Sequence, residues 1–161
     1  MPNQSASDPC LLVLFGITGD LSRRKVLPAL LELDRSGVLP ERFGIVGFSR
    51  SAGDDLGLRQ RLGEGVRKLD PKIGAEAWER FARRIYAVPG EIDDPQSFVE
   101  LARRLRQLDR ELELPGHRLF YLATPPSAFR PVLDNLRAAD LVEHAAQARR
   151  GPEGPWQRVV I

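Results

Sequence analysis

Gly16 and Gly19 stand three residues apart directly after a run of apolar residues, and a small residue, Ser22, follows three residues later. A glycine at position 16 can adopt the positive φ that a tight turn requires, and Gly19 presents backbone without a side chain. If a helix starts at this turn, its first backbone N–H groups can bind a phosphate. The spacing therefore predicts a phosphate-binding turn, although the same two glycines are also compatible with a turn that has no ligand.

Arg50 is the second residue that could bind a phosphate, and it stands between two serines after the apolar segment 43–48. In dinucleotide-binding folds an acid at the end of the second strand accepts the ribose hydroxyls of NAD, whereas an arginine there suits the additional 2′-phosphate of NADP. No acid stands at this position, and a guanidinium beside a hydroxyl matches a phosphate dianion. Arg50 taken alone could be a solvated surface arginine, but its position one strand after the glycine turn favours a phosphate ligand.

These residues need a sheet whose strands end at one edge, and the apolar segments predict such a sheet. Short apolar segments alternate with segments of helical periodicity, which is typical of an α/β fold with a doubly wound parallel sheet and helices on both faces. The expected strands are 11–15, 43–48, 85–88, 118–123 and a buried strand within 156–161. The expected helices are 20–35, 54–68, 75–84, one that Asp94 caps and one that Ser127 caps.

The composition indicates one ordinary globular domain. The chain has 161 residues, its 24 Lys and Arg nearly balance its 22 Asp and Glu, and the net charge of +2 predicts no nucleic-acid partner. A single cysteine cannot form an internal disulfide, and no apolar run reaches the length of a membrane span. We expect a cytoplasmic protein without a membrane partner, with a disordered leader over residues 1–9 and a single domain over residues 10–161.

Four segments of the chain resemble, in order, the N-terminal coenzyme domain of glucose-6-phosphate dehydrogenase. They are residues 15–25, 45–50, 120–126 and 156–161. The likeness covers nearly the whole chain from residue 10 onward. The Gly-x-x-Gly-Asp-Leu turn and the basic run 23–25 that follows it are specific to that family, which a general dinucleotide-binding pattern is not.

The resemblance implies a Rossmann-type NADP-binding domain from an oxidoreductase of carbohydrate metabolism. The family oxidises glucose 6-phosphate to 6-phosphoglucono-1,5-lactone, the first step of the pentose phosphate pathway, and passes the hydride to NADP⁺. Residues 16–22 would hold the pyrophosphate, Arg50 the 2′-phosphate, and the Thr124-Pro125 loop would border the nicotinamide, while Lys25 matches a lysine that lies toward the sugar. The implied coenzyme-binding residues are Gly16, Ile17, Thr18, Gly19, Asp20, Leu21, Ser22, Arg50, Gly90, Glu91, Thr124 and Pro125.

The sequence departs from the family pattern at its end. The last strand of the family runs into a Glu-Lys-Pro motif and a later motif supplies a histidine base, and this sequence contains neither. Two smaller departures are Ser22, which replaces the usual alanine, and the less familiar stretch 145–154. We therefore expect a truncated, monomeric chain without the C-terminal catalytic and substrate domain. Alone it would bind NADP(H) without turnover and would meet glucose 6-phosphate only with the missing portion.

The histidines lead to the same expectation. Hydride removal from a sugar carbon needs a base for the hydroxyl proton, and histidine suits this role near neutral pH. The only histidines, His117 and His144, are expected at the surface and not in catalysis, and the sequence shows no metal-ligating cluster. Two alternatives remain. One is a non-catalytic nucleotide-binding or regulatory module, and the other is an oxidoreductase of another substrate class, whose catalytic residues we do not find in this sequence.

Overall fold

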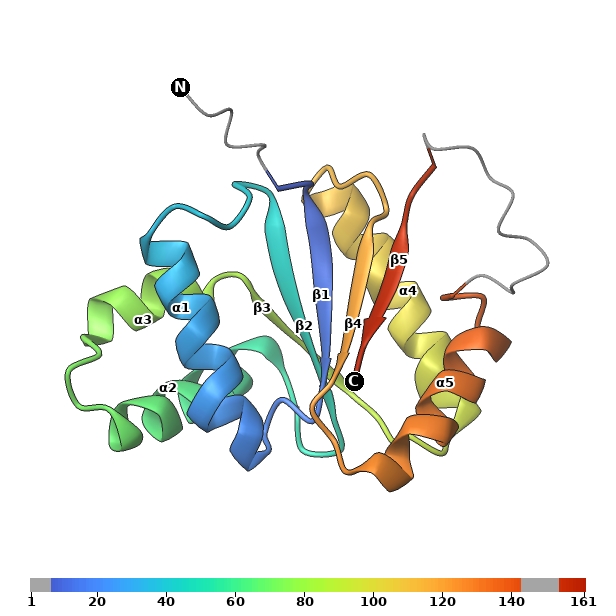
Figure 1. Ribbon diagram of the computed structural model, residues 1–161, viewed down its shortest axis with the longest axis horizontal. Coiled ribbons are helices and arrows are strands. Elements are labelled where there is room, and N and C mark those ends of the chain that lie inside the picture. Colours follow the sequence, from blue (N-terminus) through green and yellow to red (C-terminus); the bar gives the residue numbers. More distant parts are fainter. Residues whose placement is uncertain (1–6, 143–153) are drawn as a thin grey trace.

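One sheet of five parallel strands forms the centre of the computed structural model, which describes residues 7–142 and 154–161 (Figure 1). The strand order is β3-β2-β1-β4-β5, and all four neighbouring pairs are parallel. The strands are β1 (Cys10–Phe15), β2 (Phe43–Ser49), β3 (Ile85–Pro89), β4 (Arg118–Leu122) and β5 (Gln157–Val160). This order confirms the predicted α/β, doubly wound fold. Part of the expected leader, His144 and most of the stretch 145–154 lie outside the described residues.

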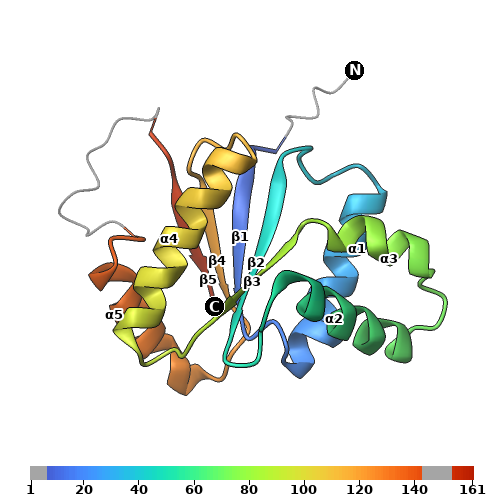
Figure 2. The ribbon, with the colours of Figure 1, turned by 180° about the vertical axis from the view of Figure 1, so that it is seen from behind.

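Helices cover both faces of this sheet, as predicted (Figures 1 and 2). Leu12 and Leu14 of β1 pack with the helices on one face, and Leu11, Val13 and Phe15 pack with those on the other. The helices of the first face are α1 (Leu27–Arg35), α2 (Asp55–Leu69) and α3 (Ala75–Ala82), and those of the second are α4 (Pro95–Glu111) and α5 (Phe129–Ala138). Every residue of β1 is buried, which explains its unbroken apolar sequence. None of these helices is long and apolar enough to cross a membrane.

The helix that follows β1 is irregular in its first half. It starts at Asp20, passes through a π-helical turn, Ser22–Val26, and continues as α1. Pro28 in the first turn of α1 has no backbone N–H to donate to the preceding turn, and a π-helical turn is one way for a helix to accommodate the lost hydrogen bond. This turn carries the basic run 23–25 directly after the glycine turn.

Two predictions about individual elements are wrong. The sequence predicts a buried last strand, but β5 is an edge strand whose described pairing is with β4 alone, and Val159 and Val160 are each 38% exposed. The sequence also predicts that Ser127 caps a helix. Instead, Ser127 lies in a 3₁₀ turn, Pro126–Ala128, that the Ala128 N–H closes onto the Pro125 carbonyl at 2.9 Å, and α5 begins without a side-chain cap.

Candidate functional site

A cleft of about 510 Å³ opens at the carboxyl edge of the sheet, where β1, β2, β3 and β4 end. In Figure 1 this edge faces downward. Doubly wound sheets bind ligands at this edge, at the point where the strand order reverses. Most of the predicted coenzyme-binding residues line the cleft, namely Gly16, Thr18, Gly19, Arg50, Gly90, Glu91, Thr124 and Pro125. The fold thus brings together residues from four strand ends that are far apart in the sequence.

The other predicted residues lie beside the cleft and not in its lining. Ile17 and Ser22 are fully buried, Leu21 is 48% exposed, and Asp20 and Lys25 are exposed on the first helical turns. Ile17 therefore fixes the turn through its packing in the core, whereas Lys25 points to no partner among the described residues. The sequence located the turn correctly, but it did not tell which of its side chains face the cleft.

The backbone of Gly16 forms the tightest part of the site. Its φ is +81°, and a Cβ at this position would lie 2.5 Å from the carbonyl oxygen of Ala123. The Gly16 carbonyl accepts hydrogen bonds from the Gly19 N–H at 2.9 Å and from the Ser22 hydroxyl at 2.8 Å. The buried Ser22 hydroxyl thus bonds to the turn itself, which explains how this polar residue is accommodated at a position where the resemblance implies alanine.

The start of the helix after Gly19 can receive an anion. A Cβ on Gly19 would meet only the Gly16 carbonyl, at 3.1 Å, so the backbone is open on its other sides. The first N–H groups of a helix have no intrahelical acceptor and carry partial positive charge. The Asp20 carboxylate would oppose an incoming phosphate, but it lies 2.7 Å from Arg24 Nε and 3.8 Å from Arg23 Nη2. These arginines offset its charge at the mouth of the turn.

Three hydroxyl groups meet next to Arg50. Thr18 Oγ1, Ser49 Oγ and Ser51 Oγ are each 3.4 Å from the other two, so they form a triangle of long, weak hydrogen bonds. Arg50 is exposed, lines the same cleft, and has no hydrogen bond or ion pair with any other described residue. Hydroxyls held this loosely can turn to a phosphate oxygen, and the guanidinium supplies the charge.

The sequence-based list of site residues lacks two members of this triangle, Ser49 and Ser51. Their position on either side of Arg50 is the signal that points to them. It lacks as well Ile92 and Asp93, which line the cleft beyond Glu91. Nothing in their spacing distinguishes these last two from an ordinary loop.

The Gly90 corner is fixed by the helix that follows it. The Gly90 N–H donates to the Ser49 carbonyl at 3.2 Å, and a Cβ on Gly90 would lie 2.7 Å from the Phe48 ring. The Glu91 N–H donates to Ser97 Oγ at 3.0 Å, while the Ser97 hydroxyl donates to Asp94 Oδ2 at 2.7 Å. This last hydrogen bond is the main reason why the pKa of Asp94 lies below its ordinary value. The predicted cap at Asp94 is confirmed.

Thr124 contributes a polar atom without a partner. Its Oγ1 is buried and has no hydrogen-bond partner among the described residues. Its Cγ2 would lie 3.2 Å from a Cβ on Gly16, so the side chain sits against the glycine turn. A buried hydroxyl without a partner costs free energy, so this group is available to a ligand or a water molecule in the cleft.

His117 is half-buried and lies at the opposite, amino edge of the sheet. It precedes β4, accepts a hydrogen bond on Nδ1 from the Trp156 N–H at 3.0 Å, and stacks on the Trp156 ring at 4.8 Å. It therefore cannot reach the cleft at the carboxyl edge. Among the described residues, no group of three or more His, Cys, Asp and Glu side chains could hold a metal ion.

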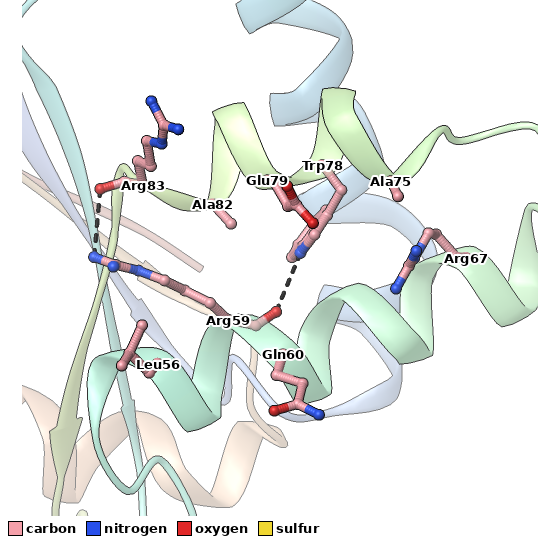
Figure 3. A pocket seen from close by; sticks show the side chains of 9 residues that line it. All are labelled: Leu56, Arg59, Gln60, Arg67, Ala75, Trp78, Glu79, Ala82 and Arg83. Carbon is pink, nitrogen blue, oxygen red and sulfur yellow. Dashed lines mark hydrogen bonds between the residues drawn. The ribbon is translucent and has the colours of Figure 1, made fainter.

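A second hollow of about 600 Å³ lies between α2 and α3, away from the strand ends (Figure 3). Its polar groups hold the two helices together. Trp78 Nε1 donates to the Arg59 carbonyl at 3.1 Å, and Arg59 Nη2 donates to the Arg83 carbonyl at 3.4 Å. No strand end and no glycine turn contributes to this hollow, so the cleft at the carboxyl edge is the better candidate for the functional site.

Comparisons with known proteins agree with the geometry of the cleft. Residues 13–161 match the family model described as "Glucose-6-phosphate dehydrogenase, NAD binding domain". The chain is 37% identical over 155 residues to glucose-6-phosphate 1-dehydrogenase of Chlamydia pneumoniae and, over the same length, to glucose-6-phosphate 1-dehydrogenase 2 of Mycobacterium tuberculosis. Each alignment covers 95% of this chain but 29% of the relative, so the chain spans less than a third of the length of these relatives.

Solved structures of the same family share this fold. One is a glucose-6-phosphate dehydrogenase in complex with its substrate glucose-6-phosphate, with a TM-score of 0.74 and 28% identity over 96% of this chain and 30% of that chain. Another, from Mycobacterium avium, gives a TM-score of 0.70 and 29% identity over 94% of this chain and 29% of that chain. The match of the family model over most of the chain, the strand order and the glycine turn lead to one conclusion: the chain belongs to the glucose-6-phosphate dehydrogenase family and corresponds to its NAD-binding domain.

Proposed function

We propose that residues 10–161 form one domain, the coenzyme-binding part of a glucose-6-phosphate 1-dehydrogenase, and that its coenzyme is NADP. The observation that carries the choice of NADP over NAD is the surroundings of Arg50. This guanidinium has no partner among the described residues, it lines the cleft with three hydroxyls, and β2 ends without an acid that could accept the ribose hydroxyls of NAD. An arginine and hydroxyls suit a phosphate dianion far better than they suit a free hydroxyl pair.

The residues of the cleft fit a dinucleotide. The open backbone at Gly19 and the start of the helix would hold the pyrophosphate, and Arg50, with Thr18, Ser49 and Ser51, would hold the 2′-phosphate. Gly90 and Glu91 would flank the coenzyme, and the unpartnered hydroxyl of Thr124, beside Pro125, would face its nicotinamide end. When bound, NADP⁺ supplies the acceptor for a hydride from the sugar. The chain's own residues bind and orient it.

Glucose 6-phosphate is the proposed substrate of the whole protein, because a structural neighbour is described in complex with it. Lys25, exposed on the π-helical turn beside the glycine turn, would lie toward the sugar. The described residues that line the cleft include no histidine, and we propose that the proton acceptor belongs to another part of the whole protein. We propose that the chain acts in the cytoplasm and binds coenzyme as a monomer without turnover.

Calorimetric titration with NADP⁺ and NAD⁺ tests the proposal. We expect the chain to bind NADP⁺ more tightly than NAD⁺. Arg50→Ala should reduce this difference in binding free energy by about 1.5–3 kcal/mol, the range for hydrogen bonds to charged groups. Arg130→Ala is the matched control, because Arg130 is 89% exposed on α5 and does not line the cleft. Equal affinity of the folded wild-type chain for both nucleotides would contradict the choice of NADP. Binding of neither nucleotide to the folded chain would mean that the glycine turn has no ligand in this chain by itself.

A further inference from the structure

Arg61 lies on α2 outside the cleft, yet it contacts the turn that carries Arg50. Its Nη2 donates to the carbonyl oxygens of Ser51 and Ala52, both at 2.7 Å. One nitrogen therefore holds two consecutive peptide groups directly after Arg50. Such charge-assisted hydrogen bonds are stronger than those between neutral groups.

Apart from this contact, the turn is restrained mainly at its first residue, where the Ser49 carbonyl also accepts a hydrogen bond from the Gly90 N–H at 3.2 Å. It closes through a hydrogen bond from the Ala52 N–H to the Ser49 carbonyl at 3.2 Å, and the Ala52 side chain is fully buried. The side chains of Arg50 and Ser51 are exposed and make no contact that would fix the peptide planes, apart from the weak hydroxyl triangle. The orientation of those planes therefore depends on Arg61.

The chain leaves a slot for this guanidinium. A Cβ on Gly53, whose φ is +66°, would lie 3.6 Å from Arg61 Nη2, and a Cβ on Gly57 would lie 3.3 Å from Nη1. Both sides of the slot are thus lined by residues without side chains. The Asp54 carboxylate borders the same slot, because its Oδ1 would lie 3.1 Å from the Cβ on Gly57, and this oxygen accepts the Gly57 N–H at 2.7 Å.

Two physical effects follow for the cleft. The carbonyl and the following N–H of a peptide point in opposite directions, so Arg61 turns the carbonyl oxygens of Ser51 and Ala52 toward α2. Their partial negative charge is thereby held away from a phosphate at Arg50. The guanidinium also places a positive charge on the turn that carries Arg50.

We infer that Arg61 is a positioning residue that sets the preference of the cleft for a 2′-phosphorylated nucleotide by fixing the Ser49–Gly53 turn. This inference rests on the proposed function, in which Arg50 holds the 2′-phosphate. Arg61 acts through the turn and does not touch the coenzyme, because it does not line the cleft. If Arg61 had only a structural role, its substitution would lower the affinity for all nucleotides by the same factor, since they all bind at the glycine turn.

The test compares 2′,5′-ADP with 5′-AMP, two ligands that differ only in the 2′-phosphate. We expect Arg61→Met to lower the affinity for 2′,5′-ADP about tenfold and that for 5′-AMP less than about twofold. Arg61→Lys should retain part of the ratio of the affinity for 2′,5′-ADP to that for 5′-AMP, because a single nitrogen makes both hydrogen bonds. Arg67→Met is the control, since Arg67 lies on the same helix, carries the same charge and donates only to Gly63 of α2. Urea unfolding of each variant verifies that it is folded.

The outcomes separate the two proposals. If the wild-type chain prefers 2′,5′-ADP and Arg50→Ala abolishes the preference while Arg61→Met keeps it, the role of Arg61 is refuted and the proposed function stands. If Arg61→Met weakens both ligands equally, or if Arg67→Met has the same effect on the ratio, Arg61 has no specific role. If the folded wild-type chain does not distinguish the two ligands, the proposed function fails and the inference fails with it. Should Arg61→Met not fold, the ratio measured for Arg61→Lys and Arg61→Gln decides in the same way.

Discussion

Replacing Gly16 by alanine tests whether the geometry of the turn is essential to the cleft. The structure separates two costs of this change. One is the backbone cost of placing a residue with a Cβ at a φ of +81°. The other is the collision of the new Cβ with the Ala123 carbonyl oxygen, which would lie 2.5 Å away and belongs to the backbone, so it cannot move aside as a side chain would.

Gly37 provides a matched control, because it has the first cost without the second. Its φ is +67°, and an added Cβ would meet nothing within 4 Å. We expect Gly37→Ala to lower the free energy of unfolding by about 1–2 kcal/mol, the cost of the left-handed conformation. Gly16→Ala should lower it by a further 1–3 kcal/mol, as forced overpacking does, and should displace the end of β4 from the turn.

Urea unfolding and NADP⁺ titration of both variants provide the measurement. We expect Gly37→Ala to bind coenzyme like the wild-type chain and Gly16→Ala to lose binding even where it is still folded. The reasoning is refuted if the two variants lose the same free energy of unfolding, or if Gly16→Ala binds NADP⁺ with unchanged affinity. In either case the contact between the turn and Ala123 would not shape the site.

Two further predictions concern the amino edge of the sheet. Burial is the main cause that raises the pKa of Cys10 from 9.0 to about 11, so the folded state holds the thiol proton more tightly than the unfolded state does. The free energy of unfolding, measured in urea, should therefore fall as the pH rises from 9 to 11. Cys10→Ala should remove that pH dependence. Arg118 pairs with Asp109 through both its terminal nitrogens, and its side chain is 8% exposed. Asp109→Ala leaves this buried charge unpaired and should lower the free energy of unfolding by about 3–5 kcal/mol. The double variant Arg118→Met, Asp109→Leu removes both charges and should lower it much less, and an equal loss would contradict the charge argument.

The sequence predicts much of the fold because its signals are local. The unbroken apolar run of β1 marks a strand that is covered on both faces, and Asp94 marks a helix start because its carboxylate needs nothing but the next few N–H groups. The burial predicted for the last strand is wrong because apolar composition does not show whether other elements cover the faces of a strand. Burial depends on what packs over Val159 and Val160, which is a property of the tertiary structure.

The candidate site is predictable in its positions and less so in its side chains. Gly16 and Arg50 could be located because a turn and a strand end have sequence signals, and their roles in binding coenzyme remain predictions. The φ and ψ angles of the turn decide which side chains face the cleft. They direct Ile17 into the core and Thr18 toward the hydroxyls of Ser49 and Ser51. The contact of Arg61 with the Arg50 turn is also hidden from the sequence, because it joins a helix to a loop across the slot at Gly53 and Gly57.

The central position of β1 has a consequence for the order of folding. The turn at Gly16 is held on one side by its N–H bond to the Phe48 carbonyl, at 3.1 Å, and on the other by the Ala123 N–H bond to the Phe15 carbonyl, at 3.0 Å. The first contact closes a short loop of chain, whereas the second closes a loop of more than a hundred residues and carries the larger entropic cost. The cleft therefore forms only after β4 has joined the sheet, so a nascent chain acquires it only once the chain has been synthesised through Pro125.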